Sequence, residues 1–194
     1  MKRGHSPLID HASGRYRLAH QAESPNQDVR PPGSCLELIV IHGISLPPGQ
    51  FGQGWVESLF LNQIADDHPD PYLRSVASLR VSAHLLIERT GNIIQFVSFK
   101  NRAWHAGISS WHGREHCNDF SVGIELEGTD TCPYEAAQYS QLALAILCLQ
   151  RSYPTLLPTG LAGHADIAPG RKSDPGPAFD WQRLESQIAK VRNA

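Results

Sequence analysis

Residues 36–42 (LELIVIH) constrain the fold more than any other segment of the chain. Apolar side chains occupy both alternating faces of this run. A strand that is apolar on both faces has to be covered on both, which is typical of a central strand in a layered α/β domain. The two alternating sets are Leu36, Leu38 and Val40, and Ile39 and Ile41. The run ends at His42, which places an imidazole where a buried strand meets a loop.

Further strands are indicated downstream. Residues 81–88 and 93–97 flank Thr90-Gly91-Asn92, a turn sequence that predicts a hairpin. In the segment 121–128, apolar residues alternate with glycine and glutamate, so Glu125 and Glu127 would share one face of a strand. That face can hold an acid pair, with at least one of the two carboxylates structural, or it can be a solvated face.

Three segments have helical spacing. A Pro/Gly-rich loop over 45–54 leads to a short helix in WVESLFLNQI, and 135–152 is the longest helical pattern. A last helix is predicted to begin at Asp180, an N-cap residue, with apolar residues at spacings of three and four. Strands interleaved with helices predict a single α/β domain with a mixed central β-sheet flanked by helices.

The N-terminal part of the chain differs from the rest. Residues 1–35 are polar, contain four prolines and have neither a strand nor a helix period. We therefore expect 1–35 to be an irregular arm and 36–194 to be the folded domain. The segment 36–194 contains no internal repeat and no second domain.

Composition excludes several classes of function. The 194 residues include 17 Lys+Arg and 19 Asp+Glu, a net charge of −2, which argues against nucleic-acid binding. No apolar run is long enough to cross a bilayer, and the N-terminus lacks the apolar region of a signal peptide. The four cysteines are widely spaced, which suits a reducing compartment. We expect a cytoplasmic protein with no membrane association and no obligate protein partner.

The segment 163–181 (GHADIAPGRKSDPGPAFDW) carries the candidate chemistry. It holds His164 and Asp174 in a loop made rigid by proline and glycine, and His42 adds a second imidazole. Two imidazoles and one carboxylate are a catalytic zinc set, since they leave a fourth position for water. The alternative from spacing alone is a hydrogen-bonded core histidine and a turn-forming aspartate.

Other residues are candidates of lower rank. A single carboxylate such as Glu125 could move a proton near a metal, and a cation such as Lys172 or Arg171 could stabilise an oxyanion. His84 lies between apolar residues and is predicted to be a buried, hydrogen-bonded histidine. His105, in AWHAG, could line a cleft.

Several blocks of the sequence resemble one enzyme family. They are VIHGISLPPGQFG, RVSAHLLIERTGNIIQFV, RAWHAG, GREHCNDFSVGIELEGTDT, AQY and GHADIAPGRKSDPGPAFDW. In this order, from about residue 36 to 181, they are similar to the zinc N-acetylmuramoyl-L-alanine amidases, the family that includes phage T7 lysozyme and the peptidoglycan recognition proteins. Within it, the chain is most similar to the cytosolic amidases of 1,6-anhydro-muramoyl peptides.

The resemblance implies a function and a set of roles. Zn²⁺ would be held by His42, His164 and Asp174, with Glu125 as general base and Lys172 beside the oxyanion. The substrate would be a small muropeptide, cleaved between (1,6-anhydro)-N-acetylmuramic acid and L-alanine during recycling of peptidoglycan. Such an enzyme would also keep the muropeptides that induce β-lactamase low.

The resemblance also implies contacts to the stem peptide, through Arg80, the backbone of Ala103 and His116. Two positions depart from the family pattern. Gly43 stands where the family usually has Asn, and His116 stands where it usually has a second Arg. Histidine binds a carboxylate more weakly than the arginine fork and in a pH-dependent way. These departures concern peptide affinity and leave the metal residues complete.

Three other functions are compatible with the fold class. The chain could be a zinc-free muropeptide-binding module, a periplasmic amidase of intact cell wall, or a structural protein with packed histidines. The complete metal set argues against the first, and the N-terminus lacks the signal that the second needs. Metal content separates the third from an enzyme.

Overall fold

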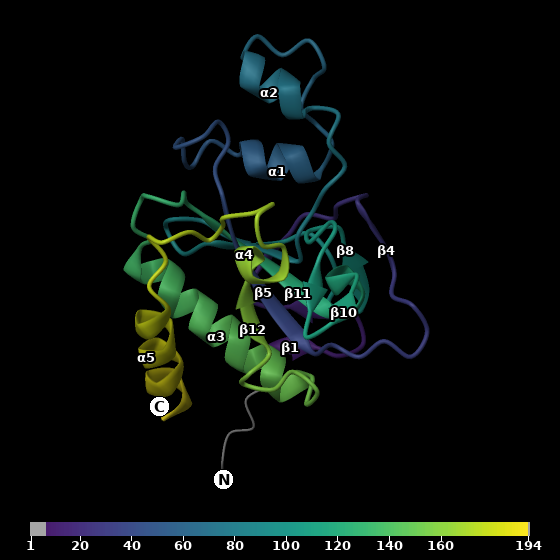
Figure 1. Cartoon of the computed structure of the whole chain (residues 1–194), viewed down its shortest axis with the longest axis vertical. Helices are drawn as coiled ribbons and strands as arrows, with labels where there is room; N and C mark the ends of the chain where they lie inside the picture. Colours follow the sequence, from purple (N-terminus) through teal and green to yellow (C-terminus); the bar gives the residue numbers. More distant parts are fainter. Residues whose placement is uncertain (1–6, 194) are drawn as a thin grey trace.

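A mixed β-sheet of six strands forms the centre of the molecule (Figure 1). The computed structural model describes residues 7–193. Along the sheet the order is β12-β5-β11-β6-β7-β3. The strands are β3 (His20–Gln21), β5 (Leu38–Ile44), β6 (Leu85–Ile87), β7 (Ile93–Gln95), β11 (Ser121–Glu127) and β12 (Leu161–Gly163). All neighbouring pairs are parallel except the hairpin β6–β7, which confirms both the mixed sheet and the predicted hairpin.

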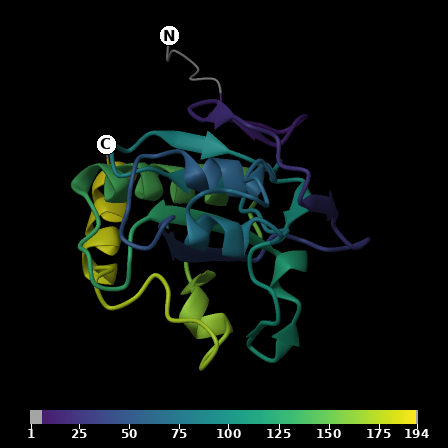
Figure 2. The same cartoon turned by 90° about the horizontal axis from the view of Figure 1, so that it is seen from above.

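Two long helices cover one face of this sheet. Helices α3 (Ala136–Ser152) and α5 (Trp181–Arg192) lie side by side in both views (Figures 1 and 2). Each begins where the sequence predicts, because Glu135 forms a capping box with Gln138 and the Asp180 side chain accepts the Arg183 N–H at 2.9 Å. The strand residues buried beneath them include Ile39, Ile41, Val122, Ile124 and Leu126.

The opposite face is covered by shorter elements. Helix α1 (Trp55–Phe60), which the sequence predicts, and helix α2 (Pro71–Val76), which it misses, pack their apolar residues over β6 and β7. Helix α2 has a local signal, since Asp70 caps the N–H groups of Tyr72 and Leu73 and a proline occupies the first turn. At six residues it is too short for an apolar period to reveal it.

The expected irregular arm is more ordered than the sequence indicates. Residues 7–35 contain four short strands, and 1–6 lie outside the described residues. Strands β1 (Ile9–Asp10) and β2 (Arg15–Tyr16) form a hairpin, β3 joins the main sheet, and β4 (Gln27–Val29) pairs with β8 (Asn101–Ala103). Ile9 and Tyr16 are buried in the main core. Strands of two or three residues are too short to show a period, so their pairing depends on partners far along the chain.

The remaining elements lie around the sheet. They are β9 (Ser110–Trp111), β10 (Arg114–Glu115), the 3-10 turn η1 (Cys117–Asp119) and α4 (His164–Ile167). Between residues 7 and 193 no helix has the length and apolar character needed to span a bilayer. All four cysteines are free thiols.

Arg102 on β8 connects the N-terminal strands to the domain. Its guanidinium binds both carboxylate oxygens of Asp28 and one of Asp119, each at 2.6 Å. The hydrogen bonds from Arg102 hold the pKa of Asp28 below its usual range. A carboxyl whose pKa is lowered by folding adds stability above its unfolded value of about 3.9, and this is lost as the pH falls through the lower, folded value.

We expect Arg102→Gln to reduce the free energy of unfolding by about 1–2 kcal/mol at pH 7, because the pairs are partly exposed. The difference from wild type should shrink as the pH falls below about 4. Urea titrations of the metal-free proteins across this range measure both effects. Arg151→Gln, at the end of α3, is the matched control, and an equal loss in that variant would contradict the prediction.

Candidate metal centre

The carboxyl ends of three parallel strands meet at one edge of the sheet. His42 lies on β5 and is the register partner of Glu125 on β11, and His164 directly follows β12. In open α/β sheets, ligands bind at this edge because loops from adjacent strands converge there. The parallel pairing therefore brings together side chains that are 39 to 122 residues apart in the chain.

Strand alternation decides which face of the sheet these side chains occupy. On β5, Ile39 and Ile41 point toward α3, so His42 points to the opposite face with Leu38 and Val40. The same alternation on β11 puts Glu125 on that opposite face. His42 and Glu125 are consequently neighbours under the loops, away from the long helices.

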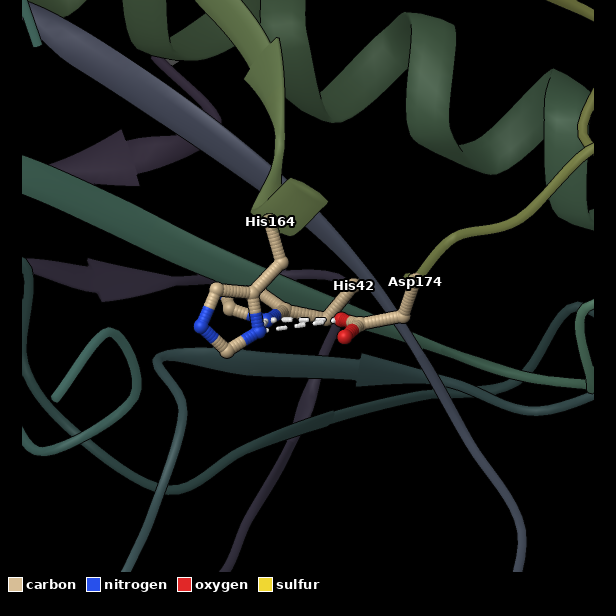
Figure 3. A group of neighbouring side chains, drawn as sticks. All are labelled: His42, His164 and Asp174. Carbon is tan, nitrogen blue, oxygen red and sulfur yellow. Dashed lines mark hydrogen bonds and ion pairs between the residues drawn. The ribbon is translucent and has the colours of Figure 1, made fainter. Parts of the chain in front are cut away.

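Three side chains converge on one point (Figure 3). Nδ1 of His42 lies 2.9 Å from Nδ1 of His164, and the two nitrogens lie 3.2 and 3.1 Å from Oδ2 of Asp174. Asp174 comes from the loop after α4, whose backbone is fixed by a 2.9 Å hydrogen bond from the Ala165 N–H to the Asp174 carbonyl. Both histidines are buried, and Asp174 is partly exposed.

The electrostatics at this point favour a neutral His42 imidazole and an ionised Asp174 carboxylate. Burial lowers the pKa of His42 to about 4, although the Asp174 hydrogen bond acts in the other direction. Burial alone would raise the pKa of Asp174, but the hydrogen bonds with His164 and His42 outweigh it and hold the pKa far below the usual range. A neutral His42 and an ionised Asp174 can each donate an electron pair to a metal.

The three atoms suit a small divalent cation. Ligands at about 2.0–2.2 Å from a tetrahedral ion lie about 3.3–3.6 Å apart, close to the spacing observed here. Two nitrogens and one oxygen are a donor set that zinc accepts, and they leave one position open. The group thus fits a catalytic metal site rather than the closed site of a structural zinc.

Glu125 lies beside this group with one oxygen unused. Its Oε1 is 3.9 Å from Nδ1 of His42, and its Oε2 is buried with no hydrogen-bond partner in the described structure. Burial, followed by the negative charge of Asp174, raises its pKa well above the usual range, while Lys172 acts in the opposite direction. A buried carboxyl with a raised pKa next to a metal site can take up and release a proton.

The alternative that Glu125 and Glu127 form a solvated face is wrong, since the two residues are only 9% and 6% exposed. They do share one face, as predicted. The Glu127 carboxylate accepts hydrogen bonds from the backbone N–H groups of Gly52 and Arg89. Glu127 therefore holds the 45–54 loop against β11, and both of its oxygens accept hydrogen bonds, whereas Oε2 of Glu125 has no partner.

The structure distinguishes the two candidate cations. The Arg171 guanidinium donates to the carbonyls of Ala106 and Ile108 at 2.6 and 2.7 Å, so its donors are used to position a loop. Lys172 is exposed, lines the hollow that contains Asp174, and has no ion-pair partner among residues 7–193. Lys172 is the cation available to a bound molecule.

The two lower-ranked histidines have different surroundings. His84 is buried and satisfied, as predicted: its Nδ1 accepts the Gly123 N–H at 3.0 Å, and its Nε2 lies 3.0 Å from Arg30. It lies just before β6 rather than within a strand. His105, which the sequence places only near a cleft, contacts one of the three converging residues directly. Its Nδ1 lies 2.9 Å from Nε2 of His42.

The group opens into a hollow of about 660 Å³. Its walls include the polar residues Glu125, His164, Lys172 and Asp174, together with Trp104, Val76 and Thr129. Of the three expected peptide contacts, Ala103 is buried on β8 and directly precedes Trp104.

Arg80 and His116 are exposed and do not line this hollow. Arg80 donates to the carbonyls of Ala77 and Leu79, and His116 lines a second hollow with Pro169 and Arg171. The structure therefore brings together the expected metal and proton-transfer residues but not these two side chains.

Gly43 has a local role that the sequence does not reveal. A Cβ atom at this position would collide with the Tyr134 hydroxyl. That hydroxyl donates a 2.9 Å hydrogen bond to the carbonyl of Pro175, next to Asp174. The missing side chain thus leaves room for a tyrosine that supports the Asp174 loop.

A mixed sheet that brings two histidines and a buried glutamate from its strand ends beside an aspartate of the following loop fits the class of metal-dependent hydrolases. Comparison with known families agrees with this class. Residues 32–177 match the model of the N-acetylmuramoyl-L-alanine amidase family, and the chain belongs to that family.

Individual relatives make the comparison more specific. The chain is 52% identical over 181 residues to the 1,6-anhydro-N-acetylmuramyl-L-alanine amidase AmpD of Citrobacter freundii, covering 93% of this chain and 95% of the relative. A crystal structure of a selenomethionine AmpD derivative superposes with a TM-score of 0.89 at 50% identity, covering 93% and 99% of the two chains.

A more distant structure contains a substrate. It is a complex of the Escherichia coli N-acetylmuramyl-L-alanine amidase AmiD with anhydro-N-acetylmuramic acid-L-Ala-D-γ-Glu-L-Lys. It has a TM-score of 0.58 at 31% identity and covers 81% of this chain and 60% of that one.

Proposed function

We propose that this protein is a zinc-dependent amidase that hydrolyses the bond between 1,6-anhydro-N-acetylmuramic acid and the L-alanine of a stem peptide. The observation that carries the proposal is the convergence of His42, His164 and Asp174 within 3.2 Å of one another beside the unpaired oxygen of Glu125. Relatives named for this reaction match almost the whole chain, and the solved structure of a related amidase is a complex with an anhydro-muramoyl peptide.

The reaction can be assigned to groups of this chain. Zinc held by the two Nδ1 atoms and Oδ2 would supply Lewis acidity to the amide carbonyl and the attacking water. Glu125 takes a proton from that water as its oxygen attacks the carbonyl carbon. The amide C–N bond then breaks, and Glu125 returns the proton to the amine of L-alanine. Lys172 stabilises the negative charge that develops on the carbonyl oxygen.

The stem peptide would follow the walls of the hollow. Leu79 and Val81, on either side of Arg80, line it, so rotation of the exposed Arg80 side chain can bring its guanidinium toward a bound peptide. Ala103 directly precedes Trp104, which lines the hollow, so the backbone at Ala103 lies next to the wall. His116, in the second hollow beside Arg171, remains a proposed contact for a carboxylate farther along the peptide.

A cytoplasmic role in recycling peptidoglycan fragments follows from this proposal. Four free thiols suit a reducing compartment, and fragments with an anhydro sugar are the material that recycling consumes. In a bacterium with an inducible β-lactamase, hydrolysis of these muropeptides would also lower the inducing signal.

The direct test is zinc content and product analysis of the purified protein. We expect one zinc per chain and release of intact tripeptide from anhydro-muramoyl tripeptide, identified by mass spectrometry. The same peptide on a reducing-end muramic acid measures preference for the anhydro sugar. Metal-free protein that binds the muropeptide without cleaving it would instead identify a recognition module.

Lys172→Met should lower kcat by about 100-fold while zinc content and KM change little, because the charge acts on the oxyanion of the transition state. Steady-state kinetics with the anhydro-muramoyl tripeptide measure the split. Lys190→Met, near the end of α5, controls for the loss of one positive charge. A rise in KM with unchanged kcat would show that Lys172 binds the substrate instead.

A further inference from the structure

His42 is only 1% exposed, and each of its two ring nitrogens lies within hydrogen-bond distance of another side chain. Nδ1 faces His164 and Asp174, and Nε2, on the other side of the ring, lies 2.9 Å from Nδ1 of His105. A neutral imidazole carries one proton, so Nδ1 can offer its electron pair to a metal only when the proton is on Nε2. A buried N–H needs an acceptor, and His105 is placed to provide it.

The contact on the other side of the His105 ring is compatible with donation from His42 to His105. If Nδ1 of His105 accepts, its own proton is on Nε2, which lies 3.1 Å from the Ser121 hydroxyl. Ser121 is the first residue of β11, the strand that also carries Glu125. The row His42–His105–Ser121 thus runs from the metal group back to the start of the strand beside it.

The position of His105 is fixed by packing as well. Its backbone N–H and that of Ala106 both donate to the Asn118 side chain, at 3.2 and 2.8 Å. Its ring lies directly over Gly123 of β11, where a Cβ atom would be 2.6 Å from Nδ1 of the ring. The ring meets His42 edge to face at an interplanar angle of 88°. Only glycine at 123 leaves space for this arrangement.

We propose that His105 is a positioning residue that accepts the Nε2–H of His42 and thereby fixes the tautomer and ring orientation that present Nδ1 to zinc. The inference rests on the proposed metal site. Metal-binding histidines commonly donate their second ring N–H to an oxygen acceptor, and loss of such an acceptor weakens metal binding by about 10–100-fold. Here the acceptor is a second histidine, itself held by Ser121.

Two substitutions of His105, similar in size, distinguish a role as hydrogen-bond acceptor from a role in packing alone. His105→Leu fills the space without an acceptor, whereas His105→Asn places an oxygen near the Nδ1 position. Zinc dissociation constants from competition with a chromophoric chelator should rise about 10–100-fold in His105→Leu and stay within about threefold of wild type in His105→Asn. His20→Leu, on the exposed strand β3, controls for loss of a histidine.

Nitrogen-15 NMR of histidine-labelled, zinc-loaded protein reports the tautomer of His42 directly. A purely structural role of His105 would leave that tautomer unchanged. Wild type should show a slowly exchanging proton on Nε2 of His42, and His105→Leu should lose it to exchange. At saturating zinc, most of the amidase activity of His105→Leu should return.

The outcomes separate the two proposals. A wild-type protein that binds no zinc overturns the metal site itself. Wild-type zinc affinity in His105→Leu, or equal weakening in His105→Asn, overturns only the role of His105. If His105→Leu shows no cooperative unfolding, Ser121→Ala decides: weaker zinc binding and loss of the His42 signal support the inference, and unchanged values of both contradict it.

Discussion

Replacing Asp174 by alanine is expected to abolish zinc binding and, with it, measurable amide hydrolysis. The Asp174 carboxylate is the only anion of the three converging groups, and its Oδ2 lies within 3.2 Å of both histidine nitrogens. Loss of an outer partner of a metal ligand already weakens binding by about 10–100-fold, so loss of the ligand itself should exceed 100-fold. Metal analysis after gel filtration and turnover of anhydro-muramoyl tripeptide measure the two effects.

Asp67→Ala is the matched control for this change, because Asp67 is an exposed carboxylate in the loop before α2. It should retain one zinc per chain and wild-type turnover. Asp174→Asn, which keeps the side-chain shape but not the charge, should resemble Asp174→Ala. A folded Asp174→Ala protein that keeps stoichiometric zinc would show that the metal is bound elsewhere.

Replacing Glu125 by glutamine should separate metal binding from proton transfer. The amide has the shape of the carboxylate but cannot take a proton from water, so kcat should fall by about 10²–10⁴-fold with zinc content unchanged. Kinetics and metal analysis on the same preparation measure both quantities. Loss of zinc from Glu125→Gln would mean that Glu125 is itself a ligand.

The same substitution should stabilise the metal-free protein at neutral pH. Burial raises the pKa of Glu125 in the folded state, so folding favours its protonated form. In the unfolded state the carboxyl has a pKa of about 4.3. Above that pH, folding requires Glu125 either to take up a proton or to ionise in a buried site, and both lower the free energy of unfolding. Glutamine removes this cost. The gain should therefore appear as the pH rises from 4 to 7 in urea titrations.

Glu127→Gln is the control on the same face of β11. Its carboxylate already accepts two backbone N–H groups, so the substitution should reduce stability and change kcat by less than about tenfold. Equal losses of kcat in the two glutamine variants would argue against a special role for Glu125.

Much of this architecture follows from local patterns in the sequence. The doubly apolar run ending at His42 identifies the central strand, alternation places Glu125 and Glu127 on one face, and Asp180 marks the start of the last helix. These features depend on side-chain period and capping, which neighbouring residues determine. The resemblance to the amidase family then selects the proposed metal ligands, which spacing alone leaves open.

Other features depend on contacts between distant segments. The strands in residues 7–35 form because β1 and β2 make a hairpin that packs into the core, while β3 and β4 find partners in β7 and β8, and no local period indicates them. The burial of Glu127 depends on the 45–54 loop folding over it.

The sequence alone thus determined which residues can do chemistry. For His42 on β5 and Glu125 on β11, the alternation along each strand also determined which face of the sheet the side chain occupies. Tertiary structure decided their relations: which oxygen of Glu125 stays unpaired, that Arg171 is occupied by backbone carbonyls and Lys172 is not, and that His105 meets His42. The physical reason is that a hydrogen bond or a buried charge depends on distances of a few ångströms between segments up to 122 residues apart. Periodicity carries no information about such distances.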